Sequence, residues 1–287
     1  MNLLRIDQEL CRTCGLCSAI CVDDVFAPAR PGAYPDPVNE QNCISCGHCV
    51  AICPAEAISH NRLRREKTVA FKEKRPRVAP EDMELLLRSK RSIRHFKNTP
   101  VPRDRIGKLL EIAQQAPSDT NSQDRRYIVV TDRPTLDELE ERLIGYYKSL
   151  IFWMKAPVRK FLSLFTPHLM EELGKVLPDF KAVVRKHEQG EKPVFRGAPC
   201  VIFIYGSKGN LMGKDNCLTA QDYLMLQAET MGLGSCIIGY ATGAPGTLAK
   251  ILNIPKGMQV YSAITLGYPK YRSPRGVDRN DPVVRWI

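Results

Sequence analysis

The chain carries the stretch CRTCGLCSAICV at residues 11–22 and a near copy, CISCGHCVAICP, at residues 43–54. Both runs follow the spacing C-x₂-C-x₂-C-x₃-C, and together they contain eight of the eleven cysteines. Three cysteines at this spacing can surround one cubane iron–sulfur cluster, whereas the fourth lies too far along the chain and ligates the other cluster of a pair. The two runs therefore predict two [4Fe–4S] clusters.

The expected ligands cross between the runs. The first cluster would take Cys11, Cys14, Cys17 and Cys53, and the second would take Cys43, Cys46, Cys49 and Cys21. Zinc is the alternative, but zinc sites favour paired C-x₂-C units separated by longer gaps. Pro54 follows the last cysteine as in the bacterial cluster-binding pattern, while Val22 stands at the matching place in the first run. Residues 1–60 thus resemble a bacterial two-cluster ferredoxin.

Length and composition leave room for a second domain. The 287 residues are 44% hydrophobic, which is enough for about two domains with buried cores. No apolar run reaches the roughly 20 residues that a spanning helix needs. The charged start MNLLRIDQEL does not have the pattern of a secretory signal, so we expect a cytoplasmic protein. Thiols stay reduced there, which favours metal binding over disulfides.

The net charge of +11 is unevenly distributed. Residues 1–60 carry a formal charge of −4 and residues 61–287 carry +15. An acidic head on a basic body argues against a uniform nucleic-acid surface, and we expect no nucleic-acid partner. The basic excess suits a phosphate-bearing cofactor, an acidic partner or a membrane surface, or it is simply a solvated face.

Three regions follow from the patterning. Residues 1–60 form the cysteine-rich head, residues 61–80 are a charged, proline-ending linker, and residues 81–287 form the body. The body mixes helical patterns, such as residues 102–117, with buried strands, such as residues 198–206. Helices interspersed with strands that do not repeat regularly predict an α+β fold.

Three short segments of the body offer polar and cationic side chains. SKRSIRHF (89–96) places three cations around a hydroxyl, as a phosphate and a polyol chain require. APSDTNSQ (116–123) is a polar loop whose amides suit the edge of a heterocycle. LGYPKYRSPR (266–275) follows a buried strand and adds further cations. Separately, each segment is also compatible with an ordinary helix end or turn.

In this order the three segments resemble those of the FMN-dependent nitroreductase family. The resemblance covers residues 81–287 and implies an α+β fold, with a mixed sheet flanked by helices, built as a homodimer with FMN at the interface. It implies the following cofactor-binding residues: Lys90, Arg91, Ser92, Arg94, Lys270 and Arg272 for phosphate and ribityl, with Pro117, Ser118, Asn121 and Gln123 in the polar loop, the first three reaching in from the other subunit, and Ile237, Ile238 and Gly239 along the flavin ring. Whether Arg275 also contacts the phosphate stays open.

Some features depart from the family or stand outside its motifs. The family often continues its loop with Pro-Trp, whereas this chain has Asp124 and Arg125. Residues 134–196 are long for the family, and we interpret them as a helical lid, with a basic surface that touches membrane as the alternative. His95 is either a proton donor or a packing residue. The three cysteines outside the runs are expected to be buried structural thiols: Cys200, Cys217 and Cys236.

Together with the cluster-binding head, the resemblance implies an FMN-dependent oxidoreductase that reduces nitro compounds, quinones or similar small electron-poor acceptors with electrons from its own clusters. Because the clusters are on the same chain, we expect reduced ferredoxin or flavodoxin as electron donor in place of a nicotinamide. Two alternatives stay open: an electron-transfer protein that uses FMN as a relay to a protein partner, and a flavin and iron–sulfur redox sensor. No side chain is assigned a catalytic role.

Overall fold

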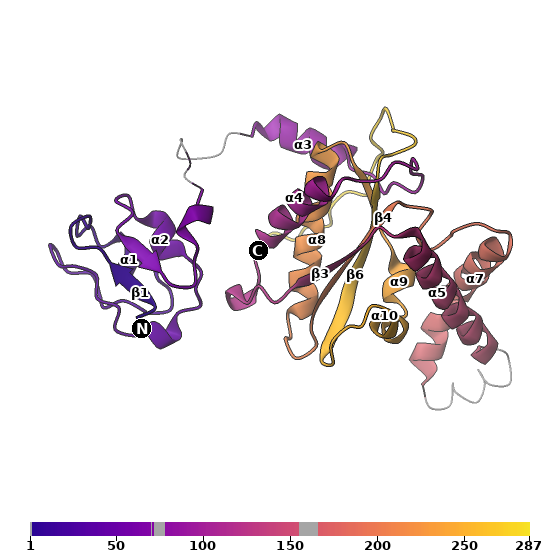
Figure 1. The fold of residues 1–287 in the computed structure, drawn as a ribbon, viewed down its shortest axis with the longest axis horizontal. Coiled ribbons are helices and arrows are strands. Elements are labelled where there is room, and N and C mark those ends of the chain that lie inside the picture. Colours follow the sequence, from indigo (N-terminus) through magenta and orange to yellow (C-terminus); the bar gives the residue numbers. More distant parts are fainter. Residues whose placement is uncertain (1, 70, 72–77, 155–165) are drawn as a thin grey trace. The chain divides into compact units, whose positions relative to one another are not determined.

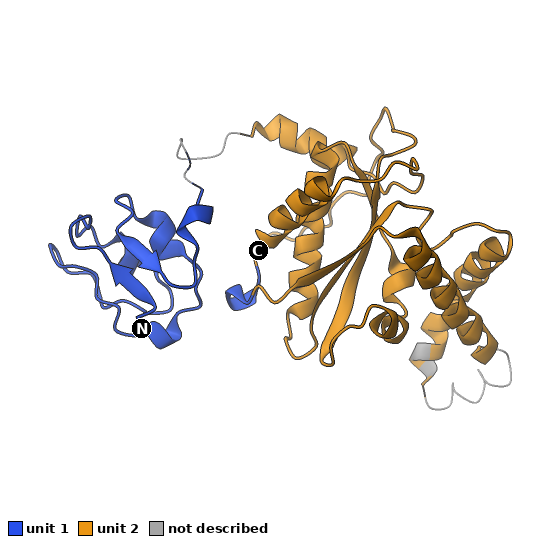
Figure 2. Ribbon diagram, in the orientation of Figure 1, with its two compact units in different colours: residues 1–77, 118–122 blue, residues 78–117, 123–287 orange. Residues whose placement is uncertain are grey.

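The computed structural model describes residues 2–69, 71, 78–154 and 166–287, which form two compact units (Figure 1). Unit 1 comprises Met1–Arg77 together with the short segment Ser118–Ser122 (Figure 2). Unit 2 comprises Val78–Pro117 and Gln123–Ile287. The boundary near residue 77 falls inside the linker expected at residues 61–80.

Unit 1 is built around the repeat of the two cysteine runs. Each run ends in one short helix, and the two outer strands pair antiparallel, with Leu4 opposite His60. Its elements are β1 (Leu4–Ile6), α1 (Leu16–Ile20), the 3₁₀ turn η1 (Glu40–Asn42), α2 (His48–Ile52), β2 (Ile58–His60) and the 3₁₀ turn η2 (Arg65–Lys67). Apolar side chains and cysteines share one small core.

The glycine inside each cysteine run has a structural reason. Gly15 and Gly47 precede α1 and α2 with φ of 71° and 78°, a left-handed conformation that glycine adopts without strain. A Cβ on Gly15 would also lie 3.0 Å from Cβ of Ala29, and one on Gly47 would lie 3.0 Å from Cδ1 of Leu63. These turns bring the third cysteine of each run back beside the first two.

Unit 2 is an antiparallel sheet in the order β3-β4-β6-β5, covered by helices on both faces (Figure 1). An isolated parallel bridge between Ser92 and Ser235 adds a parallel component at the β5 edge. Its elements are α3 (Pro80–Ser89), α4 (Arg103–Gln114), β3 (Arg126–Val130), α5 (Arg133–Trp153), α7 (Pro167–Glu188), β4 (Cys200–Ser207), α8 (Gly213–Thr230), β5 (Gly234–Ile237), α9 (Gly239–Thr242), α10 (Pro245–Ile251) and β6 (Met258–Gly267). The expected α+β class is confirmed.

The apolar run in β4 explains why helices cover both faces of the sheet. Successive side chains of a strand point to opposite faces of the sheet. Cys200, Ile202 and Ile204 join the cluster that contains α4 and α8. Val201 and Phe203 join the cluster that contains α5, α7, α9 and α10. Since both faces are buried, the strand is apolar throughout and does not alternate with polar residues.

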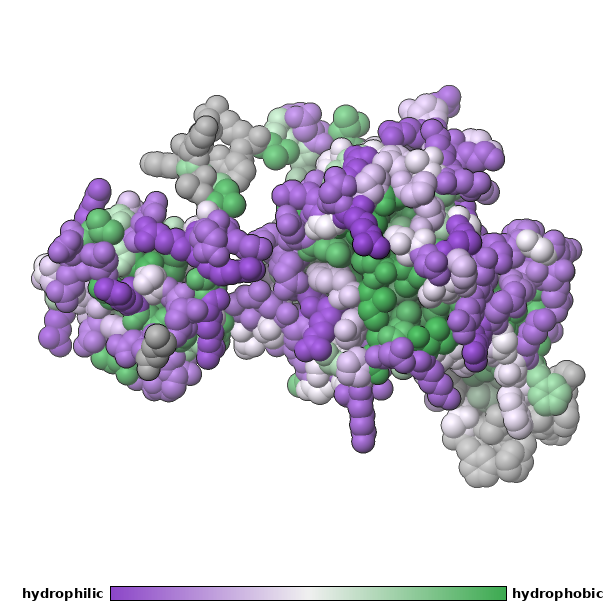
Figure 3. Space-filling view, in the orientation of Figure 1, coloured by the Kyte–Doolittle hydropathy of each residue, from purple (hydrophilic) through white to green (hydrophobic). Residues whose placement is uncertain are grey.

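Three further features bear on function. Apolar surface gathers over the sheet of unit 2 on the face that Figure 3 draws, with hydrophilic side chains on either side. The region expected to be a lid contains α5 and α7, which pack on each other, while its residues 155–165 lie outside the described residues. Within the described residues, no helix combines the length and apolar character that crossing a membrane requires.

Candidate functional site

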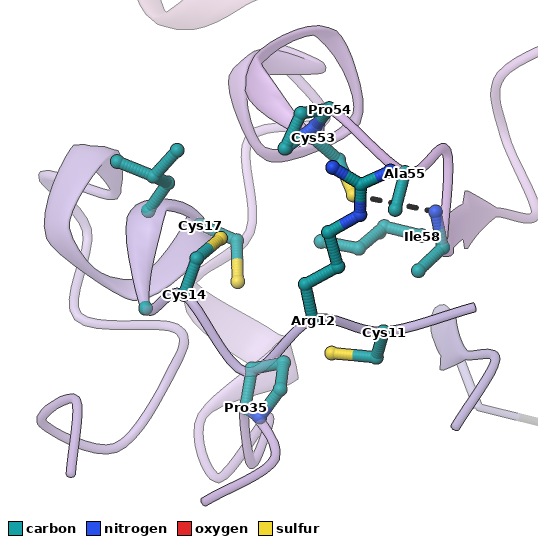
Figure 4. A pocket seen from close by; sticks show the side chains of 12 residues that line it. Cys11, Arg12, Cys14, Cys17, Pro35, Cys53, Pro54, Ala55 and Ile58 are labelled. Atoms are coloured by element: carbon teal, nitrogen blue, oxygen red, sulfur yellow. Dashed lines mark hydrogen bonds between the residues drawn. The ribbon is translucent and has the colours of Figure 1, made fainter. Parts of the chain in front are cut away.

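The first group of candidate residues is a cysteine-lined cavity in unit 1. Figure 4 shows its four thiols around one space, three from the first run and one from the second: Cys11, Cys14, Cys17 and Cys53. The backbone N–H of Ala57 donates to Sγ of Cys53 at 3.3 Å. Burial raises the pKa of the Cys17 thiol. The structure therefore gathers the crossed set of cysteines that the sequence predicts.

The second cavity repeats this arrangement with the runs exchanged. It is lined by Cys43, Cys46, Cys49 and Cys21, together with apolar side chains and His60. Burial raises the pKa of the Cys49 thiol to about 11. A thiol with that pKa stays protonated at neutral pH unless a bound metal takes the place of the proton.

The donor chemistry of both cavities fits an iron–sulfur cluster. Each offers four sulfur atoms, and each draws three of them from a C-x₂-C-x₂-C segment and the fourth from the other run. This is the ligand set of a cubane cluster in proteins that hold two of them. Such a unit can accept and release single electrons.

A second candidate site lies in unit 2, at the β5 edge of the sheet. The segment after α3 runs beside β5, where Ser92 bridges to Ser235 and the N–H of Ile93 donates to the Ser235 carbonyl at 3.0 Å. A Cβ on Gly234 would lie only 2.6 Å from Cγ1 of Ile93. Glycine at position 234 therefore permits the close approach that places the cationic segment beside β5.

The cations of this segment have different environments. Nζ of Lys90 donates to the carbonyl oxygens of Arg91 at 2.8 Å and Ser235 at 3.5 Å. Burial lowers the pKa of Lys90, and the nearby Arg91 acts in the same direction. Ser92 and Arg94 are exposed, and Arg94 has no hydrogen bond or ion pair within the described part of the chain. Arg94 is thus available to an anionic ligand.

The C-terminal motif joins the same place. The N–H of Lys97 donates to the Tyr268 carbonyl at 2.8 Å, and that of Lys270 donates to the His95 carbonyl at 2.9 Å. Nη2 of Arg272 donates to the carbonyl oxygen of Gly232 at 3.2 Å. Gly232 lies two residues before Gly234, the first residue of β5. Two segments about 175 residues apart in the sequence therefore lie side by side at β5.

The end of β5 presents the apolar part of this site. The Ile237 side chain is 47% exposed, whereas Ile238 is buried in the core. Gly239 begins α9, and a Cβ built on it would meet no atom within 4 Å. The backbone at Gly239 is therefore open to a flat apolar group, and the cations beside β5 suit an anionic group. The group at β5 fits FMN in these respects.

The polar loop is held differently. Ser118–Ser122 belong to unit 1, and Nδ2 of Asn121 donates to the carbonyl oxygens of Ile44 at 3.2 Å and Ser45 at 2.8 Å. Asn121 and Gln123 have φ of 53° and 48°. Pro117 belongs to unit 2, and its carbonyl accepts from Arg125. Of the loop that the resemblance assigns to FMN, Ser118 and Asn121 thus share a unit with the second cysteine run, whereas Pro117 and Gln123 belong to unit 2.

Several residues fulfil simpler expectations or were missed. The isolated cysteines are buried as expected, and burial raises the pKa of Cys200 and Cys217 to about 12 each. His95 is exposed, with its ring edge-on to Tyr271 at 5.7 Å between centroids, which agrees with a packing role. Sequence reasoning missed His60, which is buried beside Cys43. Its only signal was its place seven residues after Cys53.

These two sites define a redox protein, and comparison with known proteins identifies its family. The model of the nitroreductase family matches residues 87–268, more than half of the chain, so the chain belongs to that family and is an oxidoreductase. A model described as a 4Fe-4S dicluster domain matches residues 3–54.

Individual relatives agree with this assignment. An iodotyrosine deiodinase of Thermotoga neapolitana is 24% identical over 70% of this chain and 95% of its own length. An NADH dehydrogenase of Thermus thermophilus is 29% identical over 63% of this chain and 83% of its own length. Among solved structures, a nitroreductase with bound FMN from Bacteroides fragilis has a TM-score of 0.54 at 18% identity and covers 71% of this chain and 99% of its own.

Proposed function

We propose that this chain is an FMN-dependent oxidoreductase that reduces nitro compounds, quinones or similar electron-poor acceptors with electrons received through two [4Fe–4S] clusters. The observation that carries the proposal is the presence of two four-cysteine cavities on the same chain as a nitroreductase domain. A domain that handles single electrons and a domain suited to a two-electron cofactor complement each other.

FMN is the cofactor proposed for unit 2. The related Bacteroides fragilis structure contains FMN, and the β5 edge of this chain offers the groups that FMN needs. We assign Lys90, Arg91, Arg94, Lys270 and Arg272 to the phosphate and Ser92 to the ribityl chain. Ile237, the backbone of Ile238, and Gly239 are assigned to the ring. Bound FMN would accept electrons singly and deliver two to an acceptor. The cations beside it favour an anionic reduced state.

Two clusters are proposed for unit 1. The two cavities are separate, and each has its own complete set of four sulfur atoms. The dicluster description of the matching model supports the same number. Within unit 1, residues 1–60 carry a formal charge of −4, so the acidic face of this segment suits contact with a basic face of a donor protein.

A homodimer is the proposed assembly. Helix α3 has no buried residue although Met83, Leu85 and Leu87 lie along it, exposed by 43%, 67% and 53%. The C-terminal Trp286 and Ile287 are exposed as well. Large apolar side chains that are exposed to this extent indicate a surface that contacts another protein chain. We propose that the partner subunit's Pro117, Ser118 and Asn121 complete the FMN site.

The electron donor is proposed to be reduced ferredoxin or flavodoxin. Two donor molecules, each oxidised by one electron, and two protons would convert one quinone to its hydroquinone. The Thermus thermophilus relative is named an NADH dehydrogenase, so NADH is the alternative donor that has to be tested. Rapid bleaching of the flavin by NADH or NADPH alone would contradict this part of the proposal.

The composition of the purified chain tests the proposal first. We expect about eight irons, about eight sulfides and about one FMN per chain under anaerobic conditions. The chain should then turn over a nitroaromatic compound and a quinone with reduced ferredoxin. Full cofactor content with no turnover of any small acceptor would favour a relay to a protein partner or a redox sensor. Iron without flavin would contradict the assignment of the β5 site.

A further inference from the structure

His60 lies in the wall of the second cysteine cavity. It is the last residue of β2, it pairs with Leu4 of β1, and only 4% of it is exposed. The second cavity is lined by both Leu4 and His60. The imidazole is therefore fixed in place by a strand pair and is shielded from water.

The hydrogen bonds of the ring determine which nitrogen carries the proton. The backbone N–H of Arg62 donates to Nδ1 of His60 at 3.1 Å, so Nδ1 is an acceptor. In the neutral ring the proton then lies on the other nitrogen, Nε2. Nε2 is 3.6 Å from Sγ of Cys43. The ring is thus a donor of an N–H···S hydrogen bond to a residue of the second cysteine run.

Cys43 receives a second donor from the backbone. The N–H of Ser45 lies 3.4 Å from the same sulfur. In the first cavity, the sulfur of Cys53 likewise accepts from a backbone N–H, that of Ala57 at 3.3 Å. No histidine lines that cavity, and the place seven residues after the last cysteine of the first run is occupied by Pro28, which has no ring N–H. Arg12 lines the first cavity but is exposed, so water screens its charge.

We propose that the Nε2–H of His60 donates to the Cys43 sulfur and raises the reduction potential of the second cluster specifically. The inference rests on the proposed function, since it requires that both cavities hold a cluster. Reduction adds negative charge to a cluster and its thiolates, and a hydrogen bond to a ligand sulfur stabilises that charge. His60 is a positioning and tuning residue in this account, and it does not contact the substrate.

Matched variants test the proposal on the full chain. An anaerobic redox titration followed by electron paramagnetic resonance would compare the wild type, His60→Leu and His48→Gln. His48 lines the same cavity, but it is exposed and has no hydrogen bond to a cysteine sulfur among the described residues. We expect His60→Leu to lower the midpoint potential of one cluster only and His48→Gln to leave both unchanged. No shift in His60→Leu, or equal shifts of both clusters, would overturn the proposal.

A measurement without any change at His60 covers the case in which His60→Leu does not assemble. In the dithionite-reduced wild type with ¹⁵N-labelled histidine, pulsed electron paramagnetic resonance should detect a nitrogen coupled to one cluster, and His48→Gln should retain it. Absence of that coupling would refute the hydrogen bond. Iron content separates the two failures: about four irons per chain would contradict the two-cluster proposal, whereas about eight irons without the coupling would contradict the role of His60 alone.

Discussion

Nη2 of Arg125 donates to the carbonyl oxygen of Gln114 at 2.7 Å, where the last turn of α4 ends. The same guanidinium donates to the carbonyls of Ala116 and Pro117, and the residue is only 4% exposed. One buried cation thus binds three backbone carbonyls at the end of α4 and just after it, where carbonyls lack helical N–H partners. It fixes the start of the polar loop.

Removing this clamp should destabilise unit 2. Arg125→Ala leaves three carbonyls without their charged donor, and we expect a loss of about 2–4 kcal/mol in the free energy of unfolding. Arg126→Ala is the matched control, because Arg126 is the next residue and is exposed. Thermal and chemical denaturation of both variants would check the prediction. Equal stability of the two variants would show that the clamp is not needed.

Glu140 gives a prediction about pH. The carboxylate lies in the core and accepts from the N–H groups of Val194 at 2.7 Å and Phe195 at 2.9 Å. Desolvation nevertheless raises its pKa above the ordinary 4.5 in the folded chain. A raised pKa means that the contribution of Glu140 to stability is full below pH 4.5 and declines as the pH rises through the folded value.

Glu140→Gln cannot titrate and therefore lacks this decline. We expect the variant to gain stability relative to the wild type as the pH is raised above 4.5, as measured by denaturant unfolding at each pH. If the variant instead lost stability relative to the wild type as the pH rises, the hydrogen bonds from the two N–H donors would outweigh the desolvation of the carboxylate.

The exposed cation at the β5 edge should decide FMN affinity. Arg94→Ala removes a charged donor that has no competing partner among the described residues, and we expect FMN to bind about 10- to 100-fold more weakly. Arg88→Ala is the control, because Arg88 is an exposed arginine on α3 that pairs with Glu84 at 2.6 Å. Fluorescence titration of the apoprotein would measure both. Similar affinity of the two variants would remove Arg94 from the site.

The crossed cysteine sets predict which pairs of cysteine substitutions remove one cluster and which pairs remove both. Cys14→Ser and Cys53→Ser both alter the first cavity, so each alone and the two together should leave about four irons per chain. Cys46→Ser combined with Cys53→Ser alters both cavities and should leave almost none. Iron and sulfide analysis would distinguish these cases. A pairing of Cys53 with its own run would reverse the pattern.

How much of the structure could be predicted from the sequence depends on how far apart in the chain the interacting residues lie. The cysteine spacing predicted the two crossed sets of thiols because three ligands of each set lie in one short segment and the fourth is too far along the chain to join them. The apolar run at residues 198–206 predicted a buried strand. The bridge between Ser92 and Ser235 was not predictable, since strand pairing depends on contacts between distant segments. The buried positions of Glu140 and His60 also arise only when distant segments pack together.

The central claim is that electrons reach the flavin through the clusters of the same chain. Stopped-flow mixing of the oxidised holoprotein with reduced ferredoxin tests it, in the wild type and in the double variant Cys14→Ser, Cys46→Ser, after both are shown to bind equal amounts of FMN. We predict that the flavin absorbance bleaches at least about tenfold more slowly in the double variant. Equal bleaching rates in the two proteins would contradict the account.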